Sequence, residues 1–132
     1  MEASMKEHRG IVCSIQIKKN NEQAVSASAD GSCIIWDLES FTRVMCLFES
    51  TLFKQVVYHP EESQLLTTGS NKIISYWVIF DEQAIRMLDG SDEGEINALA
   101  ITKKGNYFVS GGENKVVKLW GYDEGINYYI GI

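Results

Sequence analysis

The segment Ser32-Cys33-Ile34-Ile35-Trp36-Asp37 decides the fold, because it is a short β-forming run that closes on a tryptophan and returns twice. The related runs are Ile73-Ile74-Ser75-Tyr76-Trp77 and Val116-Val117-Lys118-Leu119-Trp120. Their tryptophans lie 41 and 43 residues apart. A period of this length indicates a chain built from copies of one supersecondary unit.

Polar residues recur at fixed distances before each tryptophan. Position −10 holds a hydroxyl, and position −6 holds an Asp or Asn that suits a tight hairpin turn. These residues are Ser26, Thr67 and Ser110 for the hydroxyls, and Asp30, Asn71 and Asn114 for the turns.

Each unit also has an apolar strand pattern upstream and one more strand candidate after its tryptophan. The upstream patterns lie at 12–17, 53–58 and 96–101, and the last strands lie at 44–48, 84–88 and 126–130. Almost no segment has helical periodicity. The sequence therefore predicts an all-β protein with four short strands per unit.

The unit length, His8 and the Trp36-Asp37 pair resemble the WD40-repeat β-propeller family. The resemblance implies three four-stranded antiparallel blades that form an open, incomplete propeller. The blades are expected at about 8–49, 53–88 and 95–131 within a partial propeller spanning 1–132, after a flexible segment at 1–7. The later units depart from the family pattern, with Glu49 and Asp92 where the His would fall.

In that family a buried hydrogen-bond network joins the tryptophan, the strand hydroxyl, the loop His and the turn Asp. His8, Ser26, Asp30 and Trp36 match this network position by position. The other two units lack the His, so their networks are expected to be neutral or absent. Their corresponding residues are Thr67, Asn71, Trp77, Ser110, Asn114 and Trp120.

A catalytic alternative is a hydrolase triad of Ser26, His8 and Asp30. A nucleophilic Ser needs an oxyanion hole, and no Gly-x-Ser-x-Gly elbow supplies one. The network interpretation is therefore preferred, and no catalytic residue is assigned.

Cofactor and metal sites are not indicated either. The glycines near Lys72 and Lys115 do not have P-loop spacing. The cysteines, Cys13, Cys33 and Cys46, form no Cys-x-x-Cys pair. Cys13 and Cys33 fall at positions expected to be apolar core, which argues against zinc.

Charge excludes further classes of partner. The 132 residues carry a net charge of −6, which argues against nucleic acid and anionic lipid. No signal-peptide segment or membrane-spanning run is present, so a cytoplasmic location is expected. Loop charges are expected to divide between the two ends of the blades as candidate surfaces for protein partners. One end would carry Lys18, Lys19, Lys103 and Lys104, and the other Asp89, Asp92, Glu93 and Glu95.

Several stretches resemble the later repeats of the cilia- and flagella-associated protein 52 family more closely. They lie at 5–10, 26–38, 58–62 and 120–125. The resemblance implies a non-enzymatic scaffold of the cytoskeleton of motile cilia and flagella that binds tubulin and other inner proteins of axonemal doublet microtubules. The alternative is a soluble adaptor or substrate-receptor subunit of a cytosolic complex.

Three blades are fewer than a closed propeller needs, since such rings have four to eight. Both terminal blades would leave an apolar face uncovered. The sequence is therefore expected either to be part of a longer chain or to pack against neighbours or copies of itself. Self-association is expected if the chain is expressed alone.

Overall fold

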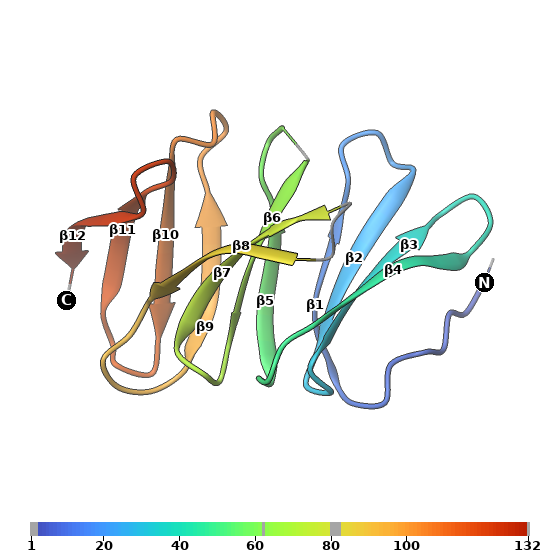
Figure 1. Ribbon diagram of the computed structural model, residues 1–132, viewed down its shortest axis with the longest axis horizontal. Coiled ribbons are helices and arrows are strands. Elements are labelled where there is room, and N and C mark those ends of the chain that lie inside the picture. Colours follow the sequence, from blue (N-terminus) through green and yellow to red (C-terminus); the bar gives the residue numbers. More distant parts are fainter. Residues whose placement is uncertain (1–2, 62, 80–82, 132) are drawn as a thin grey trace.

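A computed structural model of the protein describes residues 3–61, 63–79 and 83–131, the last six of these by their backbone alone. Twelve strands in this part form three four-stranded antiparallel sheets that stand side by side (Figure 1). Each sheet has its strands in chain order, which confirms the prediction of three antiparallel blades in an open arrangement. We call the sheets blades 1, 2 and 3.

The strand bounds follow the repeat. Blade 1 contains β1 (Val12–Ile17), β2 (Gln23–Ser28), β3 (Ser32–Asp37) and β4 (Thr42–Phe48). Blade 2 contains β5 (Phe53–Tyr58), β6 (Gln64–Gly69), β7 (Ile73–Val78) and β8 (Gln83–Asp89). Blade 3 contains β9 (Ile96–Ile101), β10 (Tyr107–Gly112), β11 (Val117–Gly121) and β12 (Ile126–Gly131).

The segment expected to be flexible, 1–7, is only partly described. Residues 1 and 2 lie outside the described residues, and residues 3–7 form no strand. Glu7 at the end of this segment pairs with Arg43 on β4, with 3.3 Å between carboxylate oxygen and guanidinium nitrogen.

The hairpin before each tryptophan strand turns through a residue of positive φ. Gly31, Lys72 and Lys115 occupy the same place in the three blades, with φ values of 86°, 66° and 65°. The third and fourth strands of each blade also share a register shift at the tryptophan, at Ile35/Trp36, Tyr76/Trp77 and Leu119/Trp120. A bulge of this kind increases local twist, so the repeat extends to the backbone.

The first strands of the blades, β1, β5 and β9, lie next to one another in the middle of the molecule (Figure 1). A direct side-chain link joins the first two. The Ser14 hydroxyl donates to Gln55 at 3.2 Å and accepts from the backbone N–H of Val56 at 3.3 Å.

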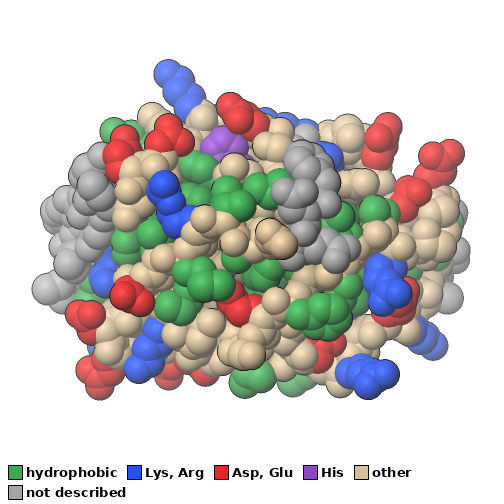
Figure 2. Space-filling view, in the orientation of Figure 1, with side chains coloured by type: hydrophobic (Ala, Val, Ile, Leu, Met, Phe, Trp, Pro, Cys, Tyr) green, Lys and Arg blue, Asp and Glu red, His purple; other side chains and the backbone are tan. Residues whose placement is uncertain are grey.

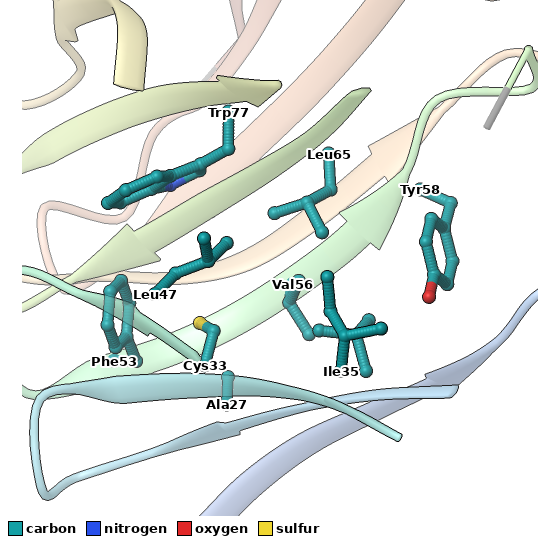
Figure 3. Close-up of a cluster of buried hydrophobic side chains, with 10 residues drawn as sticks. Ala27, Cys33, Ile35, Leu47, Phe53, Val56, Tyr58, Leu65 and Trp77 are labelled. Carbon is teal, nitrogen blue, oxygen red and sulfur yellow. The ribbon is translucent and has the colours of Figure 1, made fainter. Parts of the chain in front are cut away.

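The core lies between the blades. Side chains of β2, β3 and β4 in blade 1 pack against the first three strands of blade 2, as Figure 3 shows. This first cluster contains Val25, Ala27, Cys33, Ile35, Leu47, Phe53, Val56, Tyr58, Leu65 and Trp77. The second, between blades 2 and 3, contains Val57, Leu66, Ile74, Tyr76, Ile96, Phe108, Trp120 and Tyr122.

The cysteines differ in how deeply they are buried. Cys33 is fully buried as expected, and its burial raises the pKa of the thiol well above the usual 9.0. Cys13 is exposed, so the expectation of a core position is wrong. A register shift between Val12 and Ser14 interrupts the alternation of β1 at Cys13. Ile15 and Ile17, whose side of the strand the spacing assigned to Cys13, are themselves exposed, so that side is not part of the core.

Candidate functional site

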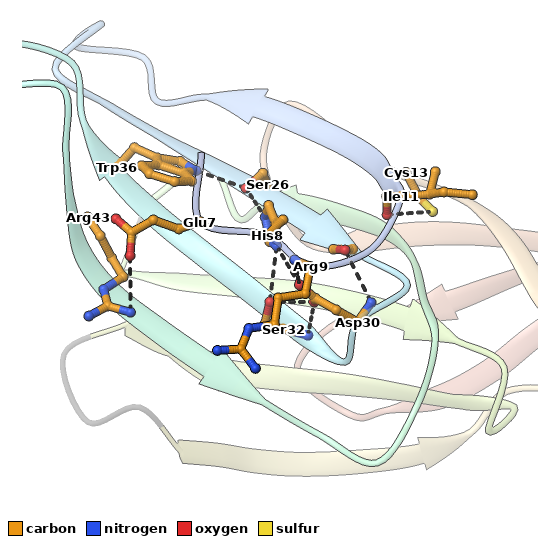
Figure 4. A network of polar contacts seen from close by, with 11 residues as sticks. Glu7, His8, Arg9, Ile11, Cys13, Ser26, Asp30, Ser32, Trp36 and Arg43 are labelled. Atoms are coloured by element: carbon orange, nitrogen blue, oxygen red, sulfur yellow. Dashed lines mark hydrogen bonds and ion pairs between the residues drawn. The ribbon is translucent and has the colours of Figure 1, made fainter. Parts of the chain in front are cut away.

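The residues of the blade 1 network meet as a chain of hydrogen bonds (Figure 4). Trp36 Nε1 donates to Ser26 Oγ at 2.8 Å. Ser26 Oγ lies 2.6 Å from His8 Nε2, and His8 Nδ1 lies 3.1 Å from Asp30 Oδ2. The N-terminal segment is thereby fastened to β2 and to the β2–β3 turn.

The donors and acceptors of this chain fit one arrangement of protons. A carboxylate only accepts, so His8 donates from Nδ1 to Asp30. With the proton on Nδ1, Nε2 accepts from the Ser26 hydroxyl, which itself accepts from Trp36. Every polar group along the chain is satisfied, as buried polar groups require.

Asp30 anchors this network. Its carboxylate also accepts from the Ser32 hydroxyl at 2.5 Å, the Ser32 backbone N–H at 2.9 Å and the Arg9 backbone N–H at 2.8 Å. Burial alone would raise its pKa, but hydrogen bonds from Ser32, Arg9 and His8 hold the pKa of Asp30 well below the usual 3.8. The sequence had not indicated Ser32, whose only signal was its place two residues after the turn Asp.

The order Ser26, His8, Asp30 is also the order of a hydrolase triad, but the surroundings of Ser26 differ from those of a nucleophile. Its oxygen accepts from Trp36, and the residue is 5% exposed. β2 pairs with strands on both sides, so the sheet uses the backbone N–H groups around Ser26 that an oxyanion hole would need. This arrangement holds two segments together.

Blade 2 has a polar network where none or a neutral one was expected. Trp77 Nε1 donates to Thr67 Oγ1 at 2.9 Å. Glu49, at the position of the missing His, accepts from the Ser75 hydroxyl at 2.7 Å and from Asn71 Nδ2 at 3.3 Å. A carboxyl group therefore fastens the β4–β5 link to the sheet, as His8 fastens the N-terminal segment.

Blade 3 has a smaller network, in which the side chains joined to the tryptophan and to the turn Asn are neutral, while Lys118 Nζ donates to the Gly90 carbonyl at 3.2 Å. Trp120 Nε1 donates to Ser110 Oγ at 3.0 Å. Asn114 Nδ2 donates to Ser91 Oγ at 3.2 Å, and Asn114 Oδ1 accepts from the Val116 N–H. Ser91 makes this contact, whereas Asp92, the residue at the His position by count, is exposed.

An aromatic cluster that sequence reasoning missed joins the ends of blades 2 and 3. The rings of Tyr76 and Tyr122 stack with centroids 4.6 Å apart, and Tyr76 Oη donates to the Tyr122 carbonyl at 2.8 Å. Burial raises the pKa of Tyr76 to about 12. His59 packs on Tyr122 and donates from Nε2 to the Gly105 carbonyl at 3.1 Å. The place of Gly105 depends on having no side chain, since a Cβ would stand 2.4 Å from His59 Nε2.

The four candidate lysines lie at one end of the blades. The turns that carry them join the first two strands of blades 1 and 3 and lie along the upper edge of Figure 1. Lys103 and Lys104 are exposed, Lys18 is half-buried, and Lys19 donates to the Pro60 carbonyl at 3.2 Å. The same end also carries acidic residues in its turns, namely Glu22, Glu39, Glu61, Asp123 and Glu124.

The candidate acidic residues lie at the opposite end, where β8 finishes and the β8–β9 link runs. Glu95 pairs with Lys54 at 3.1 Å between its oxygen and the lysine Nζ. Asp89, Asp92 and Glu93 are exposed, and Lys72 and Lys115 stand in neighbouring turns. Acidic and basic side chains occur along both edges in Figure 2, so the division of charge between the ends is incomplete.

Two other kinds of feature are absent from the described residues. No group of three or more His, Cys, Asp or Glu is placed to hold a metal ion in this part of the chain. Nor does the described part contain a helix that is long and apolar enough to span a bilayer.

Comparison with known proteins agrees with the blade architecture. The chain is 55% identical over 132 residues to cilia- and flagella-associated protein 52 of Chlamydomonas reinhardtii, covering 100% of this chain and 22% of that protein. The proteins of the same name from Sus scrofa and Homo sapiens are 48% and 46% identical, again over 100% of this chain and 21% of theirs. The chain thus spans about a fifth of the length of these relatives.

A family model described as WD domain, G-beta repeat matches residues 2–37 and 82–121. These ranges contain the His8, Ser26, Asp30 and Trp36 network of blade 1 and most of blade 3. The matched residues amount to more than half of the chain, and the three-sheet architecture agrees with the match. The chain belongs to the WD40 family of WD-domain, G-beta repeat proteins.

Proposed function

We propose that this chain is part of a non-enzymatic WD40 scaffold in the axoneme of motile cilia or flagella. The observation that carries the proposal is the identity of 46–55% over the whole chain to relatives named cilia- and flagella-associated protein 52. Rigid blades with exposed turns suit a scaffold, because such turns present contact residues on a fixed framework.

Tubulin and other inner proteins of the doublet microtubules are the proposed partners. Tubulin is acidic, so the end that carries Lys18, Lys19, Lys103 and Lys104 is the proposed contact surface for it. Lys103 and Lys104 are adjacent and exposed in one turn. Nearby Glu61 and Asp123 would repel a carboxylate placed out of register, so the mixed charges favour one orientation of the partner.

Fractionation of ciliated cells that carry a tagged form of the protein tests location. The scaffold proposal expects the tag to remain with axonemes after detergent extraction. A tag released into the soluble fraction, together with the catalytic subunits of a cytosolic complex, would instead support the adaptor alternative.

Paired charge reversals test the contact surface. The variant Lys103→Glu with Lys104→Glu is expected to lower axonemal retention. The matched control is Lys72→Glu with Lys115→Glu, which makes the same charge change in exposed turns at the other end. Equal losses in both variants would contradict a contact through the Lys103–Lys104 turn.

Self-association of this chain when it is expressed alone, through the two uncovered blade faces, is the last part of the proposal. Large apolar side chains such as Ile15 and Val117 are exposed on them, at 63% and 55%. Exposed apolar surface of this kind marks an interaction site.

A further inference from the structure

A small hollow in blade 3 lies where the ring of His8 lies in blade 1. His8 contacts the strand hydroxyl, the turn Asp and the Ser two residues after that Asp. The residues at the same three places in blade 3 are Ser110, Asn114 and Val116, and all of them line the hollow. Gly90 and Ser91 of the β8–β9 link line it as well. Its volume of about 10 Å³ matches the space that one water molecule needs and is too small for an imidazole ring.

The hydroxyl of Ser110 has a proton to donate at this place. Its oxygen accepts from Trp120 Nε1 at 3.0 Å, and among the described residues no acceptor takes the hydroxyl proton. Ser110 is 5% exposed. In blade 1 the equivalent proton goes to His8 Nε2, which lies 2.6 Å from the Ser26 oxygen. A buried donor that stays unpaired destabilises the fold, so blade 3 needs an acceptor where blade 1 has the imidazole nitrogen.

Lys118 brings a second donor to the same hollow. It pairs with Ser110 across the β10–β11 hairpin, and its Nζ donates to the Gly90 carbonyl at 3.2 Å. An ammonium group carries three protons, so Lys118 can donate to another acceptor as well. Its side chain also lines the hollow. Two donors therefore converge on a space in which one small acceptor fits.

Asn114 offers an acceptor on another wall of the hollow. Its Oδ1 accepts from the Val116 N–H at 3.2 Å and has a second lone pair. Asn114 stands where blade 1 has Asp30, which accepts from His8. A molecule that accepts from Ser110 and donates to Asn114 would therefore join the strand hydroxyl to the turn residue, as the imidazole does in blade 1.

We infer that blade 3 binds one structural water molecule in this hollow in place of an imidazole ring. The water accepts from Ser110 and Lys118 and donates to Asn114, which gives it three hydrogen bonds, about the usual number for a buried water. A halide ion could accept from the same two donors, but it is larger and has no proton for Asn114. The inference goes beyond the proposed function and is independent of axonemal location and of self-association.

A high-resolution crystal structure of the protein that contains this chain, grown without halide, tests the site. One ordered water is expected within about 3.2 Å of both Ser110 Oγ and Lys118 Nζ. The absence of ordered density there, or a protein atom that accepts from Ser110 instead, would overturn the inference. A second crystal soaked in bromide identifies the occupant, because only bromide gives an anomalous signal at the bromine edge. The water inference expects no such signal in the hollow, and a bromine peak would contradict it.

Two matched variants test whether the hollow holds the water. Val116→Ile adds a methylene to a residue that lines the hollow, and it is expected to displace the water. Val117→Ile adds the same group to the next residue, which is 55% exposed, and should leave the water in place. Water that is equally ordered in both variants would show that the hollow does not hold it.

A further variant keeps the test decisive if Val116→Ile misfolds, which far-UV circular dichroism would show. Lys118→Met keeps most of the length of the side chain and removes the ammonium donor. The occupancy of the water is then expected to fall, while Lys115→Met, in the exposed turn, should leave it unchanged. Unchanged occupancy in Lys118→Met would contradict the hydrogen bonding inferred for the site.

Discussion

The carboxyl group of Glu49 accepts a hydrogen bond from the hydroxyl of Ser75 at 2.7 Å, in blade 2. Position 49 lies 41 residues after His8, so the two residues are equivalent in the repeat. His8 contacts the Ser26 hydroxyl that accepts from the tryptophan, and also Ser32 at the start of the tryptophan strand. Glu49 contacts Ser75 within the tryptophan strand of blade 2. Two blades thus fasten their incoming segments with different chemistry at one position.

Replacing Glu49 by Ala is expected to lower the free energy of unfolding by about 1–3 kcal/mol, the cost of leaving a buried polar group unpaired. Ser75 is fully buried and would lose its acceptor. Glu49→Gln keeps an acceptor oxygen and should cost less. Urea unfolding at one protein concentration measures both, with the exposed turn residue Glu39→Ala as control. A Glu49→Ala loss no larger than that of the control would contradict a structural role.

The tryptophan runs, the polar residues at fixed distances before them and the apolar patterns on either side together predicted four strands in each unit, and each blade has four. The polar spacing has a direct structural basis. A hydroxyl ten residues before a tryptophan lies on the neighbouring strand, two residues along from the residue that pairs with the tryptophan. All three blades have the hydrogen bond from the indole to that hydroxyl. The period of the repeat was therefore the feature of the sequence that predicted the fold.

Two features of the structure could not be predicted from the sequence pattern, for physical reasons. The register shift beside Cys13 breaks the alternation on which core assignments rest, and no residue type announces it. Glu49 was visible only as a missing His, because its role depends on where Ser75 lies in the folded sheet.

Asp30 makes the stability of blade 1 depend on acidity. Its pKa in the folded protein lies below the usual 3.8, so the folded state favours the charged form. The resulting stabilisation is present above about pH 4 and is lost as the pH falls further. Comparison with Asp30→Asn should show a difference in the free energy of unfolding that is steady from about pH 7 to pH 5 and shrinks below about pH 4.

Ser32→Ala provides an intermediate case for the same measurement. It removes the 2.5 Å hydrogen bond to Asp30 and so raises the pKa of that carboxyl toward its usual value. The acid-dependent part of the stability should therefore be smaller than in the unaltered chain. A difference between the unaltered chain and Asp30→Asn that grows on acidification would reverse the sign and refute the assignment.

Lys72 stands in a backbone conformation that suits glycine, with φ at 66° where blade 1 has Gly31. A non-glycine residue in this conformation destabilises the folded chain by about 1–2 kcal/mol. Glycine removes that cost, but its greater conformational freedom in the unfolded chain offsets part of the gain. Lys72→Gly should therefore stabilise the chain by about 0.5–1 kcal/mol in thermal or urea unfolding. The reverse change, Gly31→Ala, should destabilise it, because the new Cβ would also stand 3.1 Å from the Glu49 carbonyl oxygen. Stabilisation by both changes would contradict the argument.

Thr67 and Thr68 are neighbours on β6, both at most 1% exposed, with opposite hydrogen-bonding situations. Thr67 accepts from the Trp77 indole at 2.9 Å, whereas the Thr68 hydroxyl has no hydrogen-bond partner among the described residues. Valine keeps the shape and removes the hydroxyl in each case. Thr67→Val should cost about 1–3 kcal/mol because the indole N–H loses its acceptor, while Thr68→Val should be neutral or stabilising by about 1 kcal/mol. Urea unfolding of the two variants side by side measures the difference, and a larger loss from Thr68→Val would show that its hydroxyl does have a partner.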